Sequence, residues 1–160
     1  MSQSCLDCHQ RSDRLFCDLA PRALEAFDGI KSDQMIPRGT VLFREGQAAR
    51  GVFLLCEGRV RLTVCSESGR RMTLQTVMAG ELLGLSACLT GSGYEVTAEA
   101  VDNLRVAAVN RKDLLHFLRE HREACLRVVN LLSEDLHVAY DRVRTVGLGR
   151  VRRVRSASVH

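Results

Sequence analysis

Residues 35–64 read MIPRGTVLFREGQAARGVFLLCEGRVRLTV and decide the fold, because short apolar segments alternate there with glycines. Across the chain, six runs are of strand length and rich in β-branched residues, namely 40–43, 52–56, 60–64, 72–77, 96–100 and 104–109. Such runs are typical of β-strands. They recur about every ten residues with a glycine in most turns, which indicates a small barrel or sandwich and not a βαβ sheet.

Three spaced motifs carry a resemblance to a known family: PRGTVLFREG at 37–46, LCEGRVRL at 55–62 and AGELLG at 79–84. In this order they resemble the signatures of the cyclic-nucleotide-binding β-roll, and more narrowly the sensor domain of the Crp/Fnr transcriptional regulators. The resemblance implies a mainly β protein with flanking helices. Its core would be a double-stranded, jelly-roll-like β-roll, followed by a long dimerisation helix.

The chain has 160 residues, which is enough for one domain with a sizeable core. We expect four parts: a cysteine-bearing arm at 1–18, the roll with short helices at 19–120, the long helix at 121–147 and a basic, disordered tail at 148–160. The net charge of +4 comes from the end of the chain, because residues 147–160 hold four Arg and no acid.

Two features of the composition bear on location. No window approaches the eighteen apolar residues of a spanning helix, and the N-terminus lacks the pattern of an export signal. The seven cysteines are an odd number, which favours thiols or ligands over a disulfide framework. We therefore expect a cytoplasmic protein in a reducing compartment, without a membrane partner.

The N-terminal arm carries Cys5, Cys8 and Cys17 in a C-x2-C-x8-C pattern. Three thiols so close in sequence could converge on zinc or an iron–sulfur cluster, although an apo thiol-bearing arm remains the alternative. In the oxygen-sensing branch of the resembled family, such a group and one internal cysteine hold a cluster. This chain lacks a cysteine at the matching internal position, so Cys88 or His9 would have to supply the fourth ligand. Residues 5–9 also match the C-x-x-C-H attachment motif of c-type haem, against which the missing export signal argues.

The candidate effector pocket is a cassette of seven residues: Gly80, Glu81, Leu82, Leu83, Gly84, Leu85 and Ser86. In cyclic-nucleotide binders the matching cassette holds the phosphate on backbone N–H groups at a helix N-terminus. A Glu after the second glycine and a later Arg complete that site. Here Leu85 and Ser86 follow Gly84, and no Arg occurs between Arg71 and Arg105. Loss of a charge-assisted pair costs about 1.5–3 kcal/mol, so conventional cAMP binding is not expected.

A candidate dimerisation seam runs along the long helix. Its apolar positions are spaced 4-3-4-3-4-3 and comprise Cys125, Val129, Leu132, Leu136, Ala139, Val143 and Val146. Val at a and Leu at d favour a parallel two-stranded coiled coil. The resemblance likewise implies a homodimer through this helix, and a single amphipathic helix docked on its own domain is the alternative.

The leading hypothesis is an effector- or redox-sensing regulatory domain of a Crp/Fnr-type regulator. The family places a winged helix-turn-helix after the long helix, and residues 148–160 are too few for it. Sequence-specific DNA binding is therefore expected only of a longer form. The alternatives are a cyclic-nucleotide-like small-molecule binding module and a metal- or haem-handling protein. We predict no enzyme, because no nucleophile, base and orienting group fall together.

Overall fold

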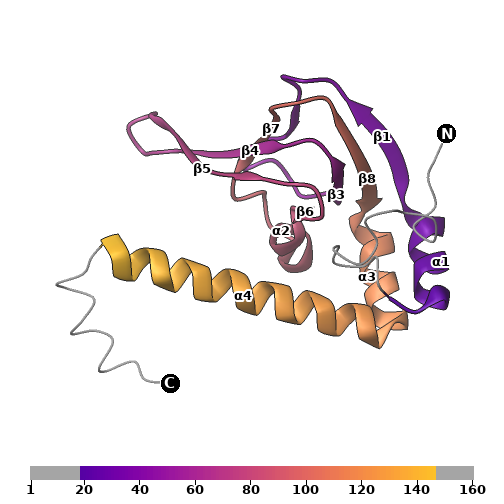
Figure 1. Ribbon diagram of the computed structural model, residues 1–160. Coiled ribbons are helices and arrows are strands. Elements are labelled where there is room, and N and C mark those ends of the chain that lie inside the picture. The colour runs from indigo at the N-terminus through magenta and orange to yellow at the C-terminus, as the bar shows by residue number, and fades with distance from the viewer. Residues whose placement is uncertain (1–18, 147–160) are drawn as a thin grey trace, which may run out of the picture. The chain divides into compact units, whose positions relative to one another are not determined.

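The computed structural model describes residues 19–146, which belong to two compact units. The first unit extends to Cys125 and contains both β-sheets (Figure 1). The second begins at Leu126, and its described part is helical. The cysteine-bearing arm and the basic tail, predicted at 1–18 and 148–160, lie outside the described residues.

The described residues form four helices and eight strands. The helices are α1 (Pro21–Ile30), α2 (Leu85–Thr90), α3 (Arg111–Glu120) and α4 (Arg122–Val146). The strands are β1 (Ser32–Ile36), β2 (Val41–Phe43), β3 (Gly51–Glu57), β4 (Val60–Cys65), β5 (Arg71–Val77), β6 (Leu82–Leu83), β7 (Thr97–Ala100) and β8 (Leu104–Asn110). All six predicted strands are present, and β1 and β6 were not predicted.

The strands make two four-stranded antiparallel sheets, in the orders β1-β8-β3-β6 and β2-β7-β4-β5. This confirms the predicted β-roll with flanking helices. Residues paired across a ladder point to the same face, so Phe53 and its partner Ala108 share one face of the first sheet. Phe53 stacks on Phe43 of the second sheet at 6.0 Å between ring centroids. Phe43 and Phe53 therefore join the two sheets by an aromatic contact.

The helices of the first unit pack through buried rings. α1 has Pro21 in its first turn and buries Leu24 and Phe27 completely. The ring of Phe27 lies 5.6 Å from that of Phe117 in α3. Asn110 caps α3, since its side-chain oxygen accepts the backbone N–H of Asp113 at 2.8 Å. No helix within residues 19–146 is long and apolar enough to span a bilayer.

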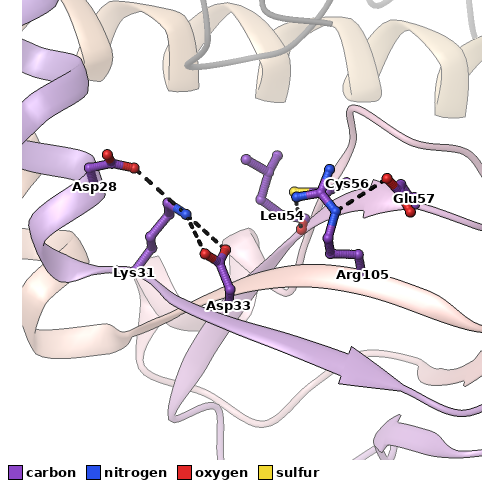
Figure 2. Close-up of polar contacts among 7 residues, drawn as sticks. All are labelled: Asp28, Lys31, Asp33, Leu54, Cys56, Glu57 and Arg105. Carbon is purple, nitrogen blue, oxygen red and sulfur yellow. Dashed lines mark hydrogen bonds and ion pairs between the residues drawn. The ribbon is translucent and has the colours of Figure 1, made fainter. Parts of the chain in front are cut away.

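Polar contacts hold the junction between α1 and the first sheet (Figure 2). The ammonium of Lys31 lies 2.8 Å from the Asp33 carboxylate and 3.6 Å from that of Asp28. Only 4% of the Lys31 side chain is exposed, so this ion pair is largely withdrawn from water. Further along the same sheet, Arg105 of β8 pairs with Glu57 of β3 at 3.3 Å.

Candidate functional site

The predicted effector cassette begins where the chain leaves β5 and returns to β3. The backbone N–H of Gly80 donates to the carbonyl of Leu55 at 2.7 Å, and that of Leu55 donates to the carbonyl of Glu81 at 2.9 Å. Leu82 and Leu83 then form β6 against β3. These bonds attach the start of the cassette to β3. Because β6 has only two residues, it depends on its pairing with β3.

The second glycine of the cassette makes the turn into α2. Gly84 precedes the helix at φ +84°, a conformation that L side chains rarely adopt. Its carbonyl accepts the N–H of Cys88 at 3.1 Å. Leu83 and Leu85 on either side are buried, whereas Ser86 is exposed. Of the seven predicted pocket residues, Leu83 and Leu85 therefore place their side chains in the hydrophobic core.

Tyr94 occupies the space beside Gly84, and no sequence pattern predicted this neighbour. A Cβ at Gly84 would lie 2.8 Å from Cε1 of the Tyr94 ring. The phenol donates to the carbonyl of Gly51 at 2.6 Å, and its ring stacks on Phe43 at 3.9 Å between centroids. Burial raises the pKa of Tyr94, so the phenol stays neutral at physiological pH. An aromatic ring, and not a cation, therefore lies against Gly84, the residue that precedes α2.

Arg111 contacts α2 at its opposite end. Its Nε donates to the carbonyl of Cys88 at 2.6 Å, and its guanidinium also lies beside Gly91, which ends the helix. A cation at a helix C-terminus offsets the partial negative charge there. Arg111 is thus placed to stabilise α2 and not to pair with an anion at its first turn.

The predicted metal or cluster ligands can be followed only in part. Cys5, Cys8, Cys17 and His9 lie outside the described residues. Cys88 is fully buried, and burial raises the pKa of its thiol while Arg111 opposes that shift. Among residues 19–146, no group of three His, Cys, Asp or Glu side chains is arranged to hold a metal ion. The ligand set therefore stays a prediction.

Four side chains of the predicted seam on α4 are described, of which three are exposed and one is half-buried. Cys125 is exposed, and Val129 and Leu136 are each 52% exposed. Leu132 is half-buried. Tyr140, 56% exposed, follows Leu136 by one helical turn and extends the same face. The heptad pattern had not included it, and the side chains of Ala139, Val143 and Val146 lie outside what is described.

Two facing antiparallel sheets and a glycine-bounded cassette that opens a short helix define the class of the protein as a cyclic-nucleotide-binding type of β-roll. The family model described as "Cyclic nucleotide-binding domain" matches residues 34–121, so the chain belongs to that family. Within it, the relatives include regulators of the Crp/Fnr type, which confirms the resemblance drawn from the three sequence motifs.

Two relatives and one solved structure illustrate the similarity. The transcriptional activatory protein AadR of Rhodopseudomonas palustris is 25% identical over 88% of this chain and 57% of its own length. The cyclic AMP receptor protein of Thermus thermophilus is 28% identical over 78% of this chain and 60% of its own. The crystal structure of the Thermus thermophilus catabolite activator protein superimposes with a TM-score of 0.76 at 26% identity, covering 83% of this chain and 62% of that one. The chain thus spans less than two thirds of each.

Proposed function

We propose that the chain is the regulatory sensor domain of a Crp/Fnr-type transcriptional regulator and that it dimerises through α4. The observation that carries this proposal is the exposed apolar face of α4, formed by Cys125, Val129, Leu136 and Tyr140. Apolar side chains left half-exposed on successive turns are typical of an interaction surface. A second copy of the same helix fits the face, because the seven-residue repeat is self-complementary in a parallel coiled coil.

A stable dimer requires most of the seam residues to be buried against the partner chain. Covering the exposed half of a Val or Leu side chain stabilises by about 1 kcal/mol, whereas association costs on the order of 4–15 kcal/mol. Val129 and Leu136 alone are therefore insufficient. The dimer needs the whole predicted stripe, and a modest change in the first unit could then bias its geometry.

A cross-linking experiment tests the parallel dimer. In a two-fold parallel seam, the two copies of Cys125 face each other, so a short bis-maleimide should join them. The variant to use carries serine at Cys5, Cys8, Cys17 and Cys65, which leaves Cys125 as the exposed thiol besides the buried Cys56 and Cys88. We expect a covalent dimer on a denaturing gel, and none after the further change Cys125→Ser. A dimer in solution that Cys125 does not cross-link would contradict the parallel arrangement.

We propose further that the effector is not cAMP. Tyr94 lies beside Gly84, which precedes α2, and the sequence between Arg71 and Arg105 supplies no cation for a cyclic phosphate. Calorimetric titration with cAMP and cGMP should give no saturable heat. A micromolar dissociation constant for either nucleotide would instead favour the alternative of a cyclic-nucleotide-binding module.

The N-terminal cysteines offer a second route to sensing, by a metal or cluster on Cys5, Cys8 and Cys17. The absorption spectrum of protein purified without oxygen tests it. A brown, oxygen-bleachable chromophore that disappears in a variant with three serines would support redox sensing, and a colourless protein free of zinc would exclude it.

A further inference from the structure

A cavity of about 410 Å³ opens at one end of the roll, among residues of β1, β2, β3 and β8. This volume lies in the range of small-molecule sites. Its floor is aromatic, because Phe43, Phe53 and Tyr94 all line it and their rings contact one another. All of its lining residues belong to the first unit.

The rim of this cavity is polar and carries a single charge. Gln34, Gln47 and Asn110 contribute exposed amide side chains. Among the described residues that line the cavity, Arg50 is the one with a charged side chain, and it too is exposed. No carboxylate lines the cavity to offset it. The site thus combines a flat aromatic surface with a net positive rim.

We propose that this cavity binds a small planar organic acid. A flat ring would stack on Phe53, the half-buried member of the three rings, because Phe43 and Tyr94 are only 3% and 6% exposed and already stack on each other. Its carboxylate would lie within reach of Arg50, whose planar guanidinium matches a carboxylate in two hydrogen bonds. The amides of Gln34 and Gln47 would satisfy further polar groups on the ligand, whereas that of Asn110 is already bonded to Asp113.

Tyr94 connects this cavity to the cassette. One part of its ring lines the cavity and stacks on Phe43, and its Cε1 edge lies against Gly84 at the start of α2. Its backbone is held by Gly46 and Gln47, at 2.8 and 2.9 Å. A ligand that presses on this ring would therefore shift Gly84 and the turn that leads into α2. This coupling rests on the proposed sensor function, whereas the binding itself does not.

The binding test uses naphthoate as the probe and the full chain with amide NMR as the readout. We expect saturable shift changes at amides of the cavity lining, with a dissociation constant near 1 mM or tighter for a ligand of this size. Naphthalene methanol, which has the same ring without the charge, should bind the wild-type protein more weakly. Shifts that fail to saturate, or that fall on α4 instead of the cavity, would overturn the proposal.

Two matched variants test the role of the charge. Arg50→Gln should weaken naphthoate binding roughly threefold to fivefold, which is the range of an exposed ion pair, and leave naphthalene methanol unaffected. Arg70→Gln removes an exposed Arg from the turn between β4 and β5, outside the cavity, and should change neither. Equal effects of the two substitutions would exclude Arg50 as the anion partner and overturn the proposal.

A ring substitution provides an independent check. Phe53→Leu keeps an apolar side chain at a half-buried position but removes the stacking surface, so both probes should bind more weakly. Unchanged binding would contradict the aromatic floor. None of these outcomes bears on whether α4 dimerises, so failure here is distinguishable from failure of the proposed function.

Discussion

Cys88 lies in the middle of α2 with a fully buried side chain, and burial raises the pKa of its thiol. A raised pKa in the folded state stabilises the fold below the unfolded value of about 8.5, and this contribution is lost as the pH rises through the folded value. Tyr94, whose pKa burial also raises, acts in the same direction at higher pH. The protein should therefore lose stability on the alkaline side.

Cys88→Ala should flatten that alkaline loss. Urea midpoints at neutral pH and at pH above about 9 would measure it, because only the wild-type thiol must ionise in an apolar site. Cys65→Ala, at an exposed cysteine, is the control and should follow the wild-type profile. If Cys88→Ala and the wild type lose stability in parallel, burial of this thiol is not the cause.

Lys31 carries a largely buried charge in the first unit, with two carboxylates beside it. Replacing it with Met should destabilise the fold by about 3–5 kcal/mol, because the carboxylates of Asp28 and Asp33 would lose their cation in a largely buried place. The matched control is Arg61→Met, which breaks the ion pair with Glu99. Arg61 is 45% exposed, so that change should cost no more than about 1 kcal/mol. If chemical denaturation shows that Lys31→Met and Arg61→Met lower the free energy of unfolding equally, burial of the Lys31 ion pairs does not add to their strength.

The sequence motifs predicted that Gly80 and Gly84 bound the cassette, but not that Tyr94 lies beside Gly84. The absence of an Arg between Arg71 and Arg105 is visible in the sequence and indicated a changed pocket. That Tyr94 lies against Gly84 is a tertiary contact between residues on either side of α2, and no local pattern encodes it. Arg111 was likewise unforeseen, since it reaches α2 from the first turn of another helix.

At the scale of elements, the start of α2 depends on Gly84. Gly84→Ala should cost about 2–4 kcal/mol, because alanine disfavours positive φ and its Cβ would meet the Tyr94 ring. Gly69→Ala is the control: Gly69 has φ +86° but nothing within 4 Å of a Cβ, so only the backbone cost of about 1–2 kcal/mol applies.

A double substitution separates the two causes. In a Tyr94→Leu background, the cost of Gly84→Ala should fall toward that of Gly69→Ala, because the flat ring is no longer in the way. Calorimetric unfolding of the wild type, the two single variants and the double variant gives the coupling free energy between residues 84 and 94. A cost that does not change in this background would mean that Tyr94 does not restrict the turn.

The strands illustrate what periodicity can predict. Six strands are rich in β-branched residues and were found from that pattern, whereas β1 and β6 were missed. β1 has the sequence SDQMI, with polar residues over its first half, and it is fixed by pairing with β8. β6 is two residues long and depends on β3. Both owe their conformation to a partner strand distant in sequence, which single-sequence patterns do not reveal.

At the scale of the whole molecule, the exposed face of α4 is expected to hold two copies together. Val129→Glu should weaken the dimer at least tenfold, because each copy would place an unpaired carboxylate in the apolar seam. Asn130→Glu adds the same charge at the next, exposed residue and should leave association nearly unchanged. Concentration-dependent light scattering would measure both, and equal effects would exclude the seam.

Sedimentation equilibrium of the wild-type protein decides whether this sensor domain is a dimer, as we propose. One chain has a mass of 17.8 kDa. We predict a species of twice that mass at micromolar concentration, which dissociates in the Val129→Glu variant. A wild-type protein that sediments as a single chain at every concentration would contradict the account, and the exposed face of α4 would then need another partner.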